Sequence, residues 1–228
     1  MCGTCGCGDD TRVNGHEGRL VVLEQKVLAR NDHVAEHNRT WLAARDIVAV
    51  NLMSSPGSGK TTLLERTIRE LGGAVSVVEG DQETEFDAER IRATGAPVVQ
   101  VNTGAGCHLD ADMLARALSS LDPAVGSVVF VENVGNLVCP ALFDLGERHR
   151  VVVMSVTEGA DKPLKYPHMF RVADVVLLNK TDLLPYVEFD TVRFADSVGQ
   201  VNSRARVIPV SATRGDGIGD WYGWLRGH

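Results

Sequence analysis

The chain has 228 residues, which is enough for one domain with a full hydrophobic core. Its 30 acidic and 23 basic residues give a net charge of −7, which argues against a nucleic-acid-binding protein because such proteins usually present a basic face. Because no apolar stretch approaches the roughly 20 residues of a membrane span and no secretory signal is visible, we expect a cytoplasmic protein that does not bind membranes.

The N-terminal residues 1–18 are polar and rich in glycine, and they hold three of the five cysteines. An odd number of cysteines in a chain without an export signal favours reduced thiols over disulfides. Cys2, Cys5 and Cys7 follow the spacing Cys-x-x-Cys-x-Cys, which brings three thiols within reach of one ion. We predict that residues 1–18 form a flexible metal-binding tail.

Residues 20–45 have a helical pattern, because Leu20, Val27, Val34 and Trp41 recur at seven-residue spacing with charges between them. This pattern predicts one amphipathic helix or two, packed on the main domain. His33 and His37 share one face of this helix, where we expect them to be simply solvated.

From residue 47 onward, short apolar runs rich in valine and isoleucine alternate with helical stretches. The expected strands are residues 47–53, 74–78, 97–101, 127–131, 150–156, 175–178 and 206–210. Continuous apolar strands separated by helices are typical of a parallel sheet that is covered on both faces. We therefore predict an α/β domain over residues 19–228, with a mostly parallel sheet of about seven strands.

A phosphate-binding loop follows the first expected strand. Residues 54–61 match the pattern G-x-x-x-x-G-K-S/T, except that Ser54 replaces the first glycine. The glycines allow backbone N–H groups to form a concave anion site, and the following helix adds its positive N-terminus. Lys60 would reach the β- and γ-phosphates, and Thr61 would bind Mg(II). We prefer this P-loop NTPase interpretation over a chance glycine-rich turn. The predicted nucleotide contacts are Gly57, Ser58, Gly59, Lys60, Thr61 and Thr62.

Two acidic residues come directly after expected strands, Asp81 after the second and Glu132 after the fourth. A carboxylate there can hold Mg(II) directly or through water. We favour Asp81 as the magnesium ligand over a plain loop acid and rank Glu132 lower. Both join Lys60 and Thr61 as candidate catalytic residues. The acidic residues between 81 and 89 fit either a switch loop or a solvated helix start.

Cys107 and His108 precede an expected helix, and Cys139 lies beyond the fourth expected strand. All three lie beyond strand ends at the same edge of a parallel sheet, so they can approach one another and the phosphates. Two thiolates and an imidazole suit Zn(II), Ni(II) or Cu(I), and three ligands leave a position open. A Cys-His pair considered alone also fits a structural role.

Guanine recognition is predicted by Asn179, Lys180 and Asp182, which match the N-K-x-D pattern near the end of the sixth expected strand. The aspartate would accept hydrogen bonds from N1–H and the exocyclic amine of guanine, a pattern that adenine cannot supply. Ser211 and Ala212 resemble a second base-contacting loop. The alternative for Asp182 is a turn residue.

Together these motifs resemble the nickel-incorporation GTPases of nickel–iron hydrogenase maturation, a P-loop GTPase family that also contains the urease nickel GTPases. The resemblance spans nearly the whole chain. It rests on the cysteine tail and on residues 54–62, 106–110, 132–140, 162–167 and 179–182.

The resemblance implies GTP hydrolysis, a tight nickel site on Cys2, Cys5 and Cys7, and a second site on Cys107, His108 and Cys139. It also implies a homodimer favoured by GTP, with the second site at or near the interface. The implied partners are a nickel chaperone and the hydrogenase large-subunit precursor. Some relatives carry a histidine-rich run after the tail, whereas this chain has only His16 there, which argues against bulk nickel storage.

Three alternative functions stay open. The chain could be a urease-type nickel GTPase, although the urease relatives lack this cysteine tail. It could be a zinc-handling GTPase, which would prefer Zn(II) over Ni(II) at both sites. It could also store or sense metal with a nucleotide site that is only regulatory.

Overall fold

The computed structural model describes residues 17–81, 86–104 and 106–227. The predicted tail therefore lies outside the described residues, except for its last two positions. Within the described residues, seven parallel strands form one sheet in the order β3-β2-β4-β1-β5-β6-β7. The strands are β1 (Val48–Ser54), β2 (Val75–Asp81), β3 (Val98–Asn102), β4 (Val128–Gly135), β5 (His149–Ser155), β6 (Val175–Asn179) and β7 (Arg206–Pro209).

Helices and short helical turns connect these strands. They are α1 (Glu17–Ala43), α2 (Lys60–Leu71), α3 (Phe86–Arg92), α4 (Ala111–Leu121), η1 (Cys139–Ala141), α5 (Lys162–Lys165), α6 (Pro167–Arg171), η2 (Thr181–Tyr186), α7 (Thr191–Val201) and α8 (Ile218–Arg226). None of the helices among the described residues has both the length and the apolar character needed to cross a bilayer.

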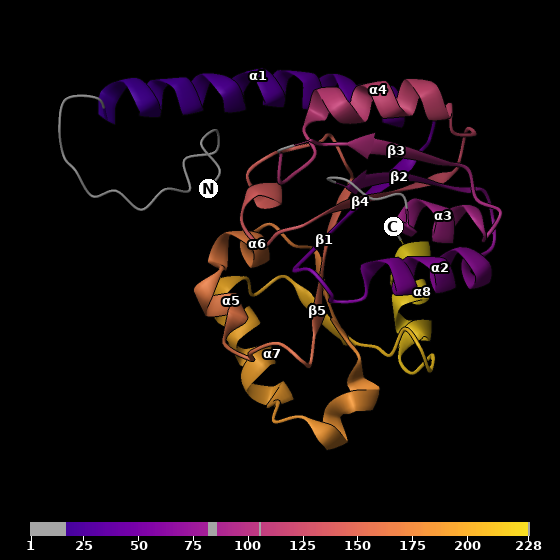
Figure 1. Cartoon of the computed structure of the whole chain (residues 1–228), viewed down its shortest axis with the longest axis vertical. Helices are drawn as coiled ribbons and strands as arrows, with labels where there is room; N and C mark the ends of the chain where they lie inside the picture. The colour runs from indigo at the N-terminus through magenta and orange to yellow at the C-terminus, as the bar shows by residue number, and fades with distance from the viewer. Residues whose placement is uncertain (1–16, 82–85, 105, 228) are drawn as a thin grey trace.

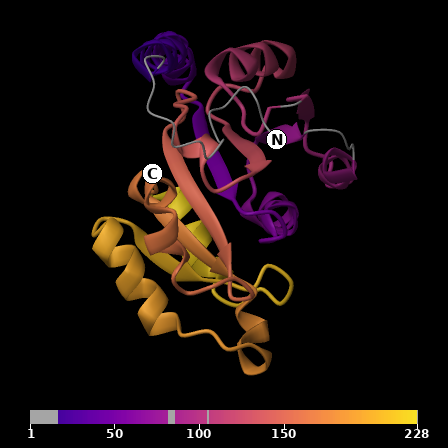
Figure 2. The same ribbon diagram turned by 60° about the vertical axis from the view of Figure 1, so that its left-hand side comes forward.

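The sheet is covered on both faces, as the apolar strands predict. Alternate residues of β5 face opposite sides: Val151 packs with α2, α3 and α8, whereas Val152 packs with α6 and α7. A third apolar cluster joins α1 and α4 to β1, β2 and β4. Figures 1 and 2 show α1 beside α4 at the top of the view, and α7 toward the bottom. The prediction of a parallel α/β domain is confirmed.

Each of the seven expected strands overlaps an observed one, but β2 and β4 end three and four residues later than expected. Strand β2 includes Asp81, and β4 continues to Gly135, so that Glu132 lies inside the strand. A charged residue normally predicts the end of a buried strand. Here β2 and β4 continue as regular strands through their acidic residues Asp81 and Glu132.

Helix α1 is a single helix, but its predicted buried stripe is wrong. Val27 is 50% exposed, and Val34 and Trp41 are only half-buried. The buried stripe is instead Asn31, Ala35, Asn38 and Leu42. This stripe has the spacing of an amphipathic helix, but two of its positions are asparagines, which a pattern of apolar residues does not reveal.

The buried asparagines replace apolar packing with hydrogen bonds to the backbone of the first residue of α4 and of the loop before β5. The Nδ2 of Asn38 donates to the carbonyl oxygens of Ala111, at 2.8 Å, and Leu145, at 2.9 Å. Asn31 accepts from the Ala111 amide at 2.9 Å and donates to the Asp144 carbonyl at 2.8 Å. Gly146 lies against this helix with φ 86°, and a Cβ there would collide with the Ala35 carbonyl oxygen. Helix α1 is therefore held to α4 and to the segment before β5.

Replacing Asn38 with alanine should destabilise the fold, because the Ala111 and Leu145 carbonyl groups each lose a buried hydrogen bond. A buried group without its partner costs about 1–3 kcal/mol, so we expect the free energy of unfolding to fall by about 2–4 kcal/mol. Urea denaturation measures this change, with Gln25→Ala on the exposed part of α1 as control. A loss below about 0.5 kcal/mol, the usual effect of a surface substitution, would contradict this role.

Candidate functional site

The loop between β1 and α2 has the geometry of a phosphate site. Gly57 and Gly59 have φ values of 74° and 94°, a region that favours glycine. A Cβ on Gly59 would lie 2.5 Å from Nδ2 of Asn179, so space as well as conformation requires glycine here. Helix α2 begins at Lys60, so the positive N-terminal end of the helix points at the loop.

Lys60 is buried at this loop, and its Nζ donates to Ser54 Oγ at 2.7 Å. Burial lowers the pKa of Lys60, while the negative charge of Glu132 acts in the opposite direction. The sequence pattern treats Ser54 only as a small replacement for glycine. The structure shows instead that its hydroxyl binds the lysine that would contact phosphate.

Thr61 and Glu132 meet across the sheet edge, where Thr61 Oγ1 donates to Glu132 Oε1 at 2.7 Å. Glu132 is 4% exposed, and its second carboxylate oxygen has no hydrogen-bond partner among the described residues. Burial raises the pKa of Glu132, and Lys60 and Thr61 lower it. The carboxylate therefore lies directly against the predicted magnesium ligand Thr61, while the preference for Asp81 over Glu132 as a magnesium ligand stays a prediction.

Asp81, at the end of β2, lines the same hollow as Glu132 and is half-buried. Glu79 of β2 is a further acidic residue near this site, and it was not predicted from the sequence. It pairs in register with Glu132 of β4 and is 2% exposed. Burial raises the pKa of Glu79 to about 8, and the charges of Glu132 and Asp81 add to this effect. A carboxylate directly after residues 75–78, two positions before Asp81, was the signal that could have revealed Glu79.

These carboxylates fit a bound Mg(II). Oxygen atoms on Glu79 and Glu132 are buried without a hydrogen-bond partner among the described residues, and hydroxyl and carboxylate oxygens are the ligands that Mg(II) prefers.

Thr62, the last predicted nucleotide contact in the loop, accepts from Arg90 of α3 at 3.0 Å. The candidate switch residues Glu83 and Glu85 lie outside the described residues.

The predicted guanine-binding residues form a network against the phosphate loop. Asn179 Nδ2 donates to the Ser58 carbonyl at 2.9 Å, and Lys180 Nζ donates to the Gly57 carbonyl at 2.6 Å. Asn179 Oδ1 accepts from the Ala212 amide at 3.0 Å. The two base-recognition loops and the phosphate loop are thus joined through Asn179.

Asp182 lies next to the second base-recognition loop, where Ser211 Oγ donates to Asp182 Oδ1 at 2.7 Å. Ser211 is fully buried and Asp182 is half-buried. One carboxylate oxygen is therefore positioned by the protein, so that the group can face a base with a defined orientation.

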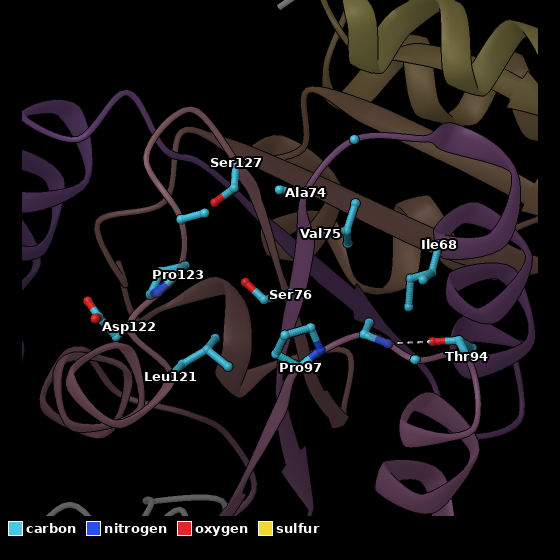
Figure 3. Close-up of a pocket in the computed structure, with 14 residues that line it drawn as sticks. Ile68, Ala74, Val75, Ser76, Thr94, Pro97, Leu121, Asp122, Pro123 and Ser127 are labelled. Atoms are coloured by element: carbon cyan, nitrogen blue, oxygen red, sulfur yellow. Dashed lines mark hydrogen bonds between the residues drawn. The ribbon is translucent and has the colours of Figure 1, made fainter.

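A hollow of about 550 Å³ connects the phosphate loop with these acids. Another hollow, of about 520 Å³, lies where β2, β3 and β4 begin, at the opposite end of the strands from the phosphate loop. Figure 3 shows the residues that line it. No basic residue lines the second hollow among the described residues, and α2, α3 and α4 end beside it with their negative ends. Phosphate would therefore be disfavoured there, and we assign the nucleotide to the first hollow.

The predicted metal ligands Cys107, His108 and Cys139 come together, with their ligand atoms within 4.8 Å of one another. Cys139 is 4% exposed, whereas Cys107 and His108 are half-buried. The His108 ring stacks on Phe143 with 3.9 Å between the ring centroids. Two thiols and an imidazole at this separation fit a Zn(II) or Ni(II) ion with an open coordination position. Cys2, Cys5 and Cys7 lie outside the described residues.

One segment, residues 132–139, contacts both sites. Glu132 binds Thr61 of the phosphate loop, and Cys139 is a member of the metal cluster. Between them, Asn133 Oδ1 accepts from the Leu109 amide at 3.1 Å, and Asn136 Nδ2 donates to the Cys107 carbonyl at 3.4 Å. The backbone on both sides of His108 is therefore hydrogen-bonded to β4 and to the residue that follows it, beside the phosphate loop.

Sequence comparison places the chain among known nucleotide-binding proteins. Residues 48–209 match the family described as CobW/HypB/UreG, nucleotide-binding domain. The hydrogenase maturation factor HypB of Azotobacter chroococcum mcd 1 is 56% identical over 211 residues, covering 92% of this chain and 69% of that protein. HypB of Escherichia coli (strain K12) is 55% identical over 209 residues, covering 91% and 72%.

Two solved structures share the fold at substantial identity. HypB from Archaeoglobus fulgidus aligns with a TM-score of 0.82 and 42% identity, covering 88% of this chain and 98% of that one. HypB from Helicobacter pylori in complex with nickel aligns with a TM-score of 0.81 and 36% identity, covering 86% and 93%. By its sequence and its fold, the chain belongs to the HypB hydrogenase maturation factors of the CobW/HypB/UreG family.

Proposed function

We propose that this chain is a cytoplasmic GTPase that carries Ni(II) and delivers it during the maturation of nickel–iron hydrogenase. Its family and the nickel complex of its Helicobacter pylori relative support this proposal. The observation that carries it is the segment of residues 132–139, which contacts the phosphate loop at one end and the Cys107–His108–Cys139 cluster at the other.

The chain's own residues supply the parts that phosphoryl transfer needs. The backbone around Gly57 and Gly59 would hold the phosphates, and Lys60 would stabilise the charge that develops on them. To do so, the Lys60 ammonium would exchange its hydrogen bond to Ser54 for phosphate oxygens. Asp182, positioned by Ser211, would select guanine.

Thr61 and Glu132, with Asp81 nearby, would hold Mg(II), which neutralises charge on the β- and γ-phosphates when it is bound. A threonine hydroxyl bonded to a buried carboxylate is a preformed pair of oxygen ligands. The buried Glu79 lies beside Glu132 with its pKa raised to about 8, so a bound cation would favour its ionised form and draw a further negative charge to this position.

Cys107, His108 and Cys139 would form a metal site whose open position lets the ion pass to another protein. The tail residues Cys2, Cys5 and Cys7 would form a separate, tighter nickel site. We propose that GTP favours a homodimer with the Cys107 site at or near its interface. Binding at the phosphate loop would then change this metal site through residues 132–139.

The partners in this proposal are a nickel chaperone and the precursor of the hydrogenase large subunit. A zinc-handling GTPase is the second candidate, because two thiolates and an imidazole suit Zn(II) as well as Ni(II). It is distinguished by a preference for Zn(II) at both sites.

Replacing Asp182 with asparagine should weaken GDP binding roughly 100-fold, because two charge-assisted hydrogen bonds of about 1.5 kcal/mol each are lost. Xanthine carries a carbonyl where guanine has its exocyclic amine, so the asparagine amide can donate to it. We therefore expect the variant to gain affinity for xanthosine diphosphate. Titration with fluorescent nucleotides measures both affinities, with Asp220→Asn, a change of an exposed residue of α8, as matched control. Unchanged GDP binding would remove Asp182 from base recognition.

Replacing Cys107 with serine should weaken metal binding at the Cys107–His108–Cys139 site at least roughly 100-fold, a loss of about 2.7 kcal/mol, because a neutral hydroxyl replaces a thiolate ligand. Cys107 is preferred to Cys139 because the latter is buried and its loss would also disturb packing. The measurement is a Ni(II) competition titration in a background with Cys2, Cys5 and Cys7 replaced by serine. If Cys107→Ser keeps the parent affinity, this cluster is not the domain's metal site.

A further inference from the structure

Two histidines on α1 stand apart from both sites described above. His33 and His37 are exposed, and their Nε2 atoms lie 3.2 Å from each other. The ring planes are nearly perpendicular, at 88°, with 4.7 Å between their centroids. The sequence pattern gave them only the role of solvated residues, but the structure turns the same nitrogen of each ring toward one point.

This separation suits two ligands of one metal ion. Zn(II) binds imidazole nitrogen at about 2.0–2.1 Å, so nitrogens 3.2 Å apart would subtend an angle of about 100° at the ion. That angle is close to both a tetrahedral and a square-planar arrangement. In the absence of an ion, the same contact can be a hydrogen bond from one ring to the other, which also holds the rings together.

The helix holds the pair in place. Residues four apart lie on the same face of a helix, one above the other. The opposite face of α1 is fixed by Ala35, Asn38 and Leu42, which are buried against the domain. Figure 1 shows α1 running beside α4 along one side of the molecule. The pair therefore lies on a fixed element and faces solvent, where an ion can arrive and leave.

Charges of both signs surround the pair: the exposed Arg30 lies one turn before His33, and acidic side chains lie nearby. Glu36 precedes His37 and forms an ion pair with Arg39, which also pairs with Asp144, so this arginine is neutralised. Asp32, which precedes His33, is exposed and negative. The chain as a whole carries a net charge of −7.

We propose that His33 and His37 form a surface site for a borderline divalent cation, Ni(II) or Zn(II), with water or a donor from a second protein completing its coordination. Two neutral imidazoles suit these ions and bind them less firmly than thiolates do. The site would exchange its ion readily. It requires neither GTP hydrolysis nor the cysteine clusters, so it can be tested separately from the proposed function.

The test is a Ni(II) titration by calorimetry on the full chain with Cys2, Cys5, Cys7 and Cys107 replaced by serine. We expect one Ni(II) to bind, and we expect the absorption spectrum of the nickel-loaded protein to lack a thiolate charge-transfer band. His33→Gln and His37→Gln should each weaken this binding at least roughly tenfold. His168→Gln, which removes an exposed histidine of α6, should leave it unchanged.

Two results would overturn the proposal. One is the absence of Ni(II) binding in the cysteine-depleted chain, which would leave the contact as a hydrogen bond between rings. The other is binding that survives both His33→Gln and His37→Gln, which would place the ion elsewhere. Circular dichroism shows that each variant is folded, and because both side chains are exposed we expect no loss of helix.

Discussion

The hydrogen bond between Thr61 and Glu132 is the constraint on which the rest of the site depends. It joins the first turn of α2 to β4, which lies between β1 and β2 in the sheet. The parallel order places the phosphate loop, Asp81 and the segment after β4 at one edge. Because β4 neighbours β1, its chain continues from the nucleotide side directly to Cys139, and the two sites share one short piece of backbone.

This edge concentrates carboxyl groups where little solvent reaches them. Glu79 and Glu132 face each other in register and are both buried, and burial raises the pKa of each. Such an arrangement is costly unless a cation is present, and Lys60, the Thr61 hydroxyl and Arg90 compensate it only in part. A divalent ion would favour the ionised carboxylates. A GTPase in which Mg(II) and nucleotide arrive together would relieve this cost on binding.

The sheet and the main motifs could be predicted because they depend on local patterns: buried valine runs, and residues 54–61 and 179–182 at fixed spacing. What failed depends on tertiary context. Asn31 and Asn38 form the buried stripe of α1 because they bond to the Ala111, Asp144 and Leu145 backbone, and no periodicity of apolar residues indicates that. Ser54 and Glu79 were overlooked since their roles come from Lys60 and from a neighbouring strand. The three cysteines near the N-terminus stay a prediction.

The central claim is that nucleotide and metal are coupled through residues 132–139, and GTP turnover tests it most directly. Phosphate release from the reduced protein would be measured without metal, with stoichiometric Ni(II) and with stoichiometric Zn(II), using ATP and Lys60→Ala as controls. The account predicts slow hydrolysis of GTP but not ATP, lost in Lys60→Ala, at a rate that changes when metal binds and stops responding in Cys107→Ser. A rate that is the same with and without either metal would contradict the coupling.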